Sequence, residues 1–322
     1  MKGLMKVPIG QRRSEAVPPP NINIPEKNPK KKETQFRWAI EQPRYVLKDL
    51  ILPKITEDQI ADVIAFFRNR ELLFYTWGLS ARYQNHDGLA VNLYGPPGTG
   101  KTMAANAIAS ELNLPMICVN YAEIESKYVG ETSKNLTALF QEASERNAVI
   151  FFDEADALLS KRVTNMTSAT DVSVNQTRSV LLTLLNDYHG VILFATNFIK
   201  NYDAAFLRRI AYHIEFYLPD REVRECLWRS YIPARMPCRV DCKMLAERYD
   251  GISGSDISNA VFTAAIGAAR EHAAVVEQFY FEKAIERIIA VKNANREDSW
   301  QITDRVLNHA PNIPNTEIQE EV

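Results

Sequence analysis

Apolar and polar residues alternate along the chain in segments that predict strands separated by helices. Almost continuous apolar runs predict buried strands at residues 89–94, 115–120, 148–152 and 191–196. Amphipathic segments between and around these runs predict helices at residues 102–109, 131–146 and 174–187. Strands of a parallel sheet are buried on both faces and read as unbroken apolar runs. The pattern therefore predicts an α/β fold, a parallel sheet with helices on both faces.

The pattern changes after Pro219, where only helical periodicity continues. Helices are predicted at 221–231, 241–249, 254–271 and about 276–293. We therefore expect a small all-helical lid domain to follow the α/β domain. The predicted divisions are an arm at 1–36, an α/β domain at 37–220, a lid at 221–296 and a tail at 297–322.

The first part of the chain differs in composition from the rest. Half of the 16 prolines fall within the first 53 residues, and Lys30, Lys31 and Lys32 follow one another. Such a segment predicts a flexible, basic, proline-rich arm without a packed core. A tether for a partner and a solvated tail both fit it. Farther on, Thr56 to Gln59 has the form of a capping box and predicts the start of a helix there.

Composition and charge exclude some classes of function. The net charge of −2 gives no general electrostatic argument for binding nucleic acid or a membrane surface. No apolar run approaches the roughly 20 residues that span a bilayer, and the first residues lack the apolar core of a signal peptide. Cys238 and Cys242 fit ordinary thiols better than zinc ligands, because no second pair or nearby His completes a site. We therefore predict a cytoplasmic protein without a membrane span.

The segment Gly95-Pro96-Pro97-Gly98-Thr99-Gly100-Lys101-Thr102 has the pattern G-x-x-x-x-G-K-[ST]. It lies between a predicted strand and a predicted helix, as in loops whose backbone N–H groups bind nucleotide phosphates. Lys101 would reach the β- and γ-phosphates, and the Thr102 hydroxyl would ligate Mg²⁺. A glycine-rich turn that matches by accident is the alternative, and the strand and helix around it argue against that. The predicted nucleotide contacts run from Gly95 through Met103.

A second pair of candidate residues follows the strand at 148–152. Asp153 would lie at the carboxyl end of that strand, where its carboxylate can hold Mg²⁺ through water. Glu154 would then orient or deprotonate the water that attacks the γ-phosphate. Two solvated acids are the alternative. The phosphate loop about fifty residues upstream favours the catalytic interpretation, and the Asp-Glu pair favours hydrolysis over phosphate transfer.

With these residues in place, the sequence resembles the AAA family of the AAA+ ATPases, from about Asp49 to Ala290. The segments 95–102 and 151–156 resemble the family's two Walker motifs. Thr196-Asn197 resembles sensor 1, and 203–209 resembles the second region of homology. The segment 251–256 is similar to the G-x-S-G-x-D motif of the lid. The lid motif has Ser255-Asp256 where many AAA+ proteins carry a sensor-2 arginine, which matches AAA proteins proper.

The resemblance implies ATP and Mg²⁺ as cofactors and assigns further roles. Asn197 would help to hold the attacking water. Arg208 and Arg209 align with arginine fingers that reach the nucleotide of a neighbouring subunit, although two adjacent arginines taken alone fit ordinary surface charge. Fingers that act in trans require a ring, and the family implies a homo-hexamer. Four residues would contact the adenosine part of the nucleotide: Asp49, Leu50, Gly254 and Ser255.

The segment Lys127-Tyr128-Val129-Gly130 resembles the pore loop with which substrate-threading AAA proteins grip a polypeptide. An aromatic and an aliphatic side chain on a loop can pack between substrate side chains of many kinds. Packing of Tyr128 in the core is the alternative. The neighbouring Lys, Gly and Glu favour exposure. Position and composition predict a second pore loop at 161–170.

These features favour a ring-shaped ATPase that remodels, unfolds or disassembles protein substrates in a central pore. By family analogy the substrate could be a HORMA-domain protein, which could itself be the adaptor. Partner recognition would come from the basic arm, the pore entrance or a separate adaptor protein. The alternative is a nucleic-acid-associated ATPase, such as a helicase loader or transposition helper. That function needs a basic, aromatic-lined surface, and the chain offers only the basic arm.

Overall fold

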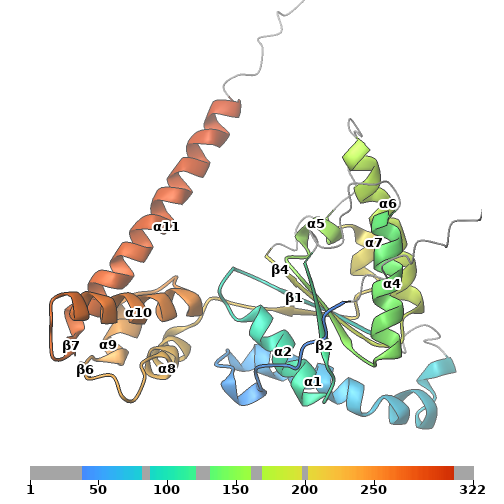
Figure 1. Ribbon diagram of the computed structural model, residues 1–322, viewed down its shortest axis with the longest axis horizontal. Helices are drawn as coiled ribbons and strands as arrows, with labels where there is room; N and C mark the ends of the chain where they lie inside the picture. Colours follow the sequence, from blue (N-terminus) through green and yellow to red (C-terminus); the bar gives the residue numbers. More distant parts are fainter. Residues whose placement is uncertain (1–37, 82–87, 121–130, 161–168, 198–201, 308–322) are drawn as a thin grey trace, which may run out of the picture. The chain divides into compact units, whose positions relative to one another are not determined.

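A computed structural model describes residues 38–81, 88–120, 131–160, 169–197 and 202–307 (Figure 1). Five parallel strands form its main sheet in the order β2-β3-β4-β1-β5. The strands are β1 (Leu89–Tyr94), β2 (Met116–Asn120), β3 (Val149–Asp153), β4 (Val191–Thr196) and β5 (Tyr212–Glu215). The predicted α/β fold with a parallel sheet is confirmed.

Successive side chains of each strand point to opposite faces of the sheet, and two apolar cores result. On β1, Val91 and Leu93 belong to one core, whereas Ala90 belongs to the other. The first core is covered by α1 (Lys54–Arg68) and α2 (Lys101–Glu111), and the second by α4 (Glu131–Glu145) and α6 (Ala169–Asp187). Figure 1 shows these two helix pairs on opposite sides of the strands. The continuous apolar runs in the sequence are thus strands buried on both faces.

The described chain begins along one edge of this sheet. Glu41 and Met116 exchange both backbone hydrogen bonds, at 2.8 and 2.9 Å, so a short antiparallel bridge covers the edge at β2. Trp38 is buried, and its backbone N–H donates to the Glu142 carboxylate of α4 at 3.1 Å. Short helices η1 (Leu47–Asp49), η2 (Leu72–Thr76), η3 (Leu79–Ala81), α5 (Asp156–Leu159) and α7 (Ala204–Leu207) complete this part.

One local expectation for this part was wrong, and one strand was missed. The capping box at Thr56 was wrong, because α1 begins two residues earlier, at Lys54, with Pro53 as its N-cap. The Thr56 side chain is buried and donates to the backbone carbonyl of Glu215 at 3.1 Å, so it joins α1 to β5. Strand β5 itself was not predicted. It has four residues, of which only Ile214 is buried, and so it lacks an apolar run.

The segment after Pro219 contains α8 (Arg221–Tyr231), α9 (Cys242–Arg248), α10 (Gly254–Arg270) and α11 (Gln278–Leu307). The predicted helices are therefore present, but α11 continues well beyond residue 293. The expectation of helices alone was incomplete. Two-residue strands β6 (Cys238–Arg239) and β7 (Val276–Glu277) pair in parallel, and strands this short give no periodic signal.

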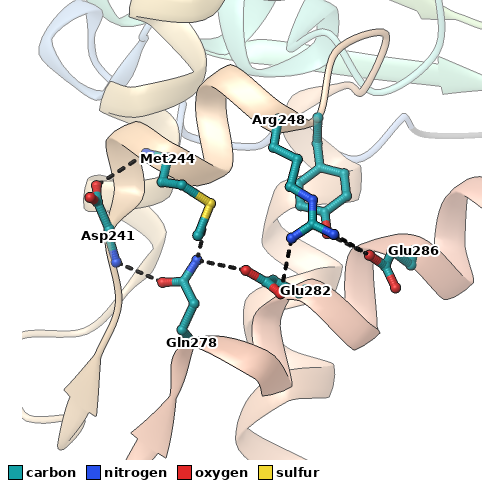
Figure 2. A network of polar contacts seen from close by, with 7 residues as sticks. Asp241, Met244, Arg248, Gln278, Glu282 and Glu286 are labelled. Carbon is teal, nitrogen blue, oxygen red and sulfur yellow. Dashed lines mark hydrogen bonds and ion pairs between the residues drawn. The ribbon is translucent and has the colours of Figure 1, made fainter.

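A polar network joins α9 to α11 (Figure 2). The Gln278 side chain accepts from the backbone N–H of Asp241 at 2.8 Å and donates to Glu282 at 3.2 Å. Arg248, at the end of α9, pairs with both Glu282 and Glu286 of α11, at 3.2 and 3.4 Å. Because one arginine contacts two acids a turn apart, the network fixes the register of α9 along α11.

Contacts group the described residues into one compact unit, and the division near residue 220 stays a prediction. Within the part of the chain that the structure describes, no helix has the length and apolar character needed to cross a bilayer. The same residues contain no cluster of His, Cys, Asp and Glu suited to a metal ion, and Cys238 and Cys242 are free thiols.

Candidate active site

The loop from Gly95 to Gly100 connects the end of β1 to the start of α2. Gly95 has φ of +145°, and a Cβ atom there would lie 2.1 Å from the backbone oxygen of Phe216. Only glycine fits at such a position. Gly100 is the N-cap of α2, so the free N–H groups of the first helical turn face the loop. The sequence therefore folds into the strand–loop–helix arrangement predicted for phosphate binding.

Lys101, the first residue of α2, is held by three acceptors. Its Nζ donates to the backbone oxygens of Gly95 and Pro96, at 2.8 and 2.9 Å, and to Oδ1 of Asn197 at 3.0 Å. Burial lowers the pKa of Lys101 below its ordinary value, and the nearby carboxylates of Asp153 and Asp156 oppose that shift. The ammonium group is thus directed across the loop, where an anion would be its natural counter-charge.

Thr102 and Asp153 bring a hydroxyl and a carboxylate together at the end of the sheet. Thr102 Oγ1 lies 3.1 Å from Asp153 Oδ2, although 51 positions separate them in the sequence. Hydroxyl and carboxylate oxygens are the hard ligands that Mg²⁺ prefers, usually with waters and phosphate oxygens completing the octahedron. The donor set therefore fits the predicted magnesium site.

Glu154 follows directly and has an unusual backbone. Its φ is +52°, in the left-handed region that non-glycine residues rarely adopt, and its N–H donates to Asp153 Oδ1 at 3.0 Å. Such strain is typically held in place at functional sites. The next backbone N–H, of Ala155, is fixed by the oxygen of Ala195 on β4 at 2.9 Å. The side chain of Glu154 is consequently displayed at the carboxyl edge of the sheet.

Asn197 follows β4, and Asp156 determines where it lies. Both carboxylate oxygens of Asp156 accept from the Asn197 N–H, at 3.1 and 3.2 Å. Together with the bond from Lys101, this fixes both the backbone and the side chain of Asn197. The positioning role of Asp156 was not predicted. An acid three residues after Asp153 was visible in the sequence, but its partner lies 41 positions away.

A cleft of about 610 Å³ collects most of the predicted residues. Those that line it are Asp49, Leu50, Pro97, Gly98, Thr99, Gly100, Lys101, Thr102, Met103, Asp153, Glu154, Asn197, Gly254 and Ser255. Gly95 and Pro96 contribute their carbonyls to Lys101 from behind it. The carboxylate of Asp49 accepts from the N–H of Val46 at 2.9 Å and so stabilises η1.

Aromatic and aliphatic residues that the sequence did not single out also line the cleft. Among these are Leu52, Tyr217, Val223, Leu227 and Tyr231. They provide the apolar surface on which the flat base of a nucleotide would pack, opposite to the polar phosphate side. They come from several elements far apart in the sequence, and no local pattern marks them.

The start of α10 contacts the phosphate loop directly. The N–H of Ser255 donates to the carbonyl of Gly98 at 3.2 Å, and Ser253 Oγ lies 3.1 Å from Ser255 Oγ. The lid motif predicted from the sequence is therefore part of the cleft wall.

Comparison with known proteins shows which family has sequences similar to those that form this site. Residues 91–218 match the family described as ATPase family associated with various cellular activities (AAA). The chain contains an AAA ATPase domain. Proteins of this family use ATP with Mg²⁺, and the Lys101 and Thr102–Asp153 geometry fits both.

Similar proteins share this domain. An ATP-dependent zinc metalloprotease FtsH of Lachnoclostridium phytofermentans is 34% identical over 73% of this chain and 41% of its own length. The ATP-dependent zinc metalloprotease FtsH 3 of Sphaerobacter thermophilus is 32% identical over 78% of this chain and 51% of its own length. A 26S proteasome regulatory subunit 8 homolog of Schizosaccharomyces pombe is 34% identical over 66% of this chain and 53% of its own length. The chain thus spans about half, or less, of the length of these relatives.

Within the AAA domain, Arg208 is the C-cap of α7, and Arg209 follows it. The Arg208 side chain is exposed, whereas Arg209 donates to Asn186 Oδ1 at 2.8 Å and to the oxygen of Ala205 at 3.0 Å. Neither arginine is among the described residues that line the cleft of its own chain. The pore-loop residues Lys127, Tyr128, Val129 and Gly130, and most of the second pore loop, lie outside the described residues.

Proposed function

We propose that this chain is an ATP-hydrolysing subunit of a ring that remodels protein substrates.

 The main support is that Lys101, Thr102, Asp153 and Asn197 meet at the carboxyl edge of one sheet. Lys101 Nζ lies 3.0 Å from Asn197 Oδ1, and Thr102 Oγ1, on the next residue, lies 3.1 Å from Asp153 Oδ2. Three strands contribute to it, and the strained Glu154 lies beside it. Residues that only stabilised the fold would not need a strained acid at the mouth of a cleft.

Each residue has a distinct role in the proposed hydrolysis. Bound ATP with Mg²⁺ would supply the phosphoanhydride bond that is cleaved. Lys101 neutralises phosphate charge, and Thr102 with Asp153 provides the oxygens that hold the cation. Glu154 accepts a proton from the attacking water, while the Asn197 amide orients that water.

The two arginines differ in what they are free to do. Arg209 is tied to its own chain through Asn186 and Ala205, whereas the Arg208 side chain is exposed. We therefore assign Arg208 as the finger that reaches the neighbouring subunit's nucleotide, with Arg209 fixing the end of α7. A cation supplied in trans stabilises charge in the transition state and makes turnover depend on ring assembly. By family resemblance the ring is a homo-hexamer.

The proposed substrate is a protein that Tyr128 and its copies grip in the central pore. The names of the relatives, a metalloprotease and a proteasome subunit, support a polypeptide rather than a nucleic acid. The specific substrate, including the HORMA-domain class, and any adaptor stay predictions from the sequence.

The hydrolysis is tested with Glu154→Gln. This variant should bind ATP like the unsubstituted chain and hydrolyse it about 100-fold or more slowly, because the general base is lost. Glu145→Gln, at an exposed position on α4, is the control and should retain full activity. Normal turnover by Glu154→Gln would contradict the assignment.

The composite site is tested by mixing inactive variants. Arg208→Ala subunits retain Glu154, and Glu154→Gln subunits retain Arg208, so mixed rings contain some complete sites. ATPase activity should therefore reappear on mixing. Its absence, with assembly confirmed by light scattering, would exclude a finger in trans.

Remodelling is tested separately with Tyr128→Ala. Basal hydrolysis should persist while unfolding of a fluorescent protein with an unstructured tail is lost. Tyr75→Ala, which removes a tyrosine that is 76% exposed on η2, is the control. Stimulation of the ATPase by single-stranded DNA but not by unfolded protein would favour the nucleic-acid alternative.

A further inference from the structure

Asp256, in the first turn of α10, is a carboxylate with little contact with solvent. It is 7% exposed and accepts from the N–H and the hydroxyl of Ser253, both at 2.7 Å. Ser253 in turn accepts from the N–H of Asp256, so the two residues form a capping box. This reciprocal pair determines where α10 begins.

A cation from α11 completes the environment of Asp256. The ammonium group of Lys292 donates to Asp256 Oδ2, the same oxygen that Ser253 contacts. Burial raises the pKa of Asp256, but the bonds from Lys292 and Ser253 outweigh this effect and keep the pKa below its ordinary value. A buried carboxylate that lost its cation would remain desolvated without compensation.

The capping box also contacts the phosphate loop. Ser255 lies between Gly254 and Asp256, and its N–H donates to the carbonyl of Gly98 at 3.2 Å. Its hydroxyl lies 3.1 Å from that of Ser253. An unbroken series of contacts thus joins Lys292 to Asp256, Ser253, Ser255 and finally Gly98.

We propose that Lys292 is a positioning residue for the nucleotide cleft, because its ion pair with Asp256 holds the start of α10 against the phosphate loop. Lys292 itself is not among the described residues that line the cleft, so it acts through Asp256. The lid motif lacks an arginine, and this lysine stabilises the motif from another helix. The role rests on the proposed nucleotide site.

The first test needs no nucleotide. Hydrogen exchange of the full chain is measured by mass spectrometry for Lys292→Met and Lys292→Arg. Peptides that cover 95–100 and 251–258 should exchange about tenfold faster in Lys292→Met, the change expected when one charge-assisted bond is lost. Lys292→Arg should restore slow exchange, because it keeps the cation.

Matched controls separate positioning from general stability. Arg287→Met removes another α11 cation that lines the same 310 Å³ cavity beside Lys292, and it should exchange like the unsubstituted chain. A peptide that covers β3 should be unchanged in all variants. Faster exchange everywhere, or unchanged exchange at 95–100 in Lys292→Met, would overturn the proposal.

The second test is binding of a fluorescent ADP analogue, followed by steady-state kinetics. Lys292→Met should raise the Kd and the KM for ATP about tenfold and change kcat less than about twofold, because it touches no reacting atom. A lower kcat with an unchanged Kd would overturn the positioning role. If the unsubstituted chain bound no nucleotide, the proposed function would fail, whereas the exchange experiment would still decide the role of Lys292.

Discussion

Gly98 is the point at which the phosphate loop meets the lid, and Gly98→Ala perturbs it in two ways. Its φ of +76° lies in the left-handed region. A Cβ atom there would lie 2.0 Å from the hydroxyl oxygen of Ser255 and 2.7 Å from that of Ser253. The substitution therefore adds backbone strain and also forces the start of α10 away from the loop.

The two contributions can be estimated and separated. An L-residue in the left-handed region costs about 1–2 kcal/mol, and an extra methyl group in filled space costs about 1–3 kcal/mol. Gly98→Ala should therefore lower the free energy of unfolding by about 2–5 kcal/mol. Gly251→Ala is the matched control, since φ is +66° there and a Cβ atom would meet nothing within 4 Å. It should cost only the strain, about 1–2 kcal/mol.

Urea unfolding of the single variants and of Gly98→Ala combined with Ser255→Gly measures these terms. Ser255→Gly removes the nearer of the two colliding side chains. Adding Gly98→Ala to Ser255→Gly should therefore cost about 1–3 kcal/mol less than adding it to the unsubstituted chain. If the start of α10 moves away from the loop and the rest of the fold keeps its stability, the steric contribution appears instead as weaker binding of ADP by Gly98→Ala. Three results together would refute the reasoning. These are equal losses of unfolding free energy for Gly98→Ala and Gly251→Ala, no recovery of that free energy in the double variant, and unchanged ADP binding.

Two further predictions concern stability. Arg224 is buried and donates two hydrogen bonds to the oxygen of Ala246, at 2.7 and 3.1 Å, so Arg224→Met should cost about 3 kcal/mol in urea unfolding. Arg221→Ala, which breaks an exposed ion pair, should cost less than about 1 kcal/mol. Burial lowers the pKa of His213 below 6.5, so its contribution to stability is complete above pH 6.5 and decreases as the pH falls through the lowered value. Unfolding measured between pH 8 and pH 5 should show a shallower slope for His213→Gln than for the exposed control His272→Gln; equal slopes would contradict the prediction.

Local sequence signals were sufficient for four of the five strands of the main sheet and for the phosphate side of the cleft. The strands β1, β3 and β4 are each buried on both faces, so their apolar runs are long enough to recognise. The loop before Lys101 is determined by glycines whose backbone few other residues can adopt. In both cases the information lies within a few consecutive residues, and the predicted elements match the structure closely.

Features that depend on contacts between distant residues were missed. Thr56 was interpreted as a cap, but its hydroxyl bonds a strand 159 positions away. Asp156 ends the predicted Walker-like segment 151–156, but its contact with Asn197 was not predicted, and Lys292 looks like an ordinary surface charge in the sequence. Each acquires its role from a partner on another part of the chain. The apolar wall of the cleft is assembled in the same way. The sequence indicates whether a side chain can donate, accept or carry charge, whereas the fold determines which partner it contacts.

The contact between Ser255 and Gly98 has a thermodynamic consequence if Lys292 acts as proposed. Coupling between two sites is reciprocal, so a lid position that strengthens nucleotide binding is itself favoured by bound nucleotide to the same extent. A tenfold change in affinity through Lys292 corresponds to about 1.4 kcal/mol of coupling. Nucleotide binding would then stabilise the start of α10 and its ion pair with α11 by that amount. The state of the cleft would therefore be coupled to the part of α11 that carries Lys292, a residue that is not among the described ones that line the cleft.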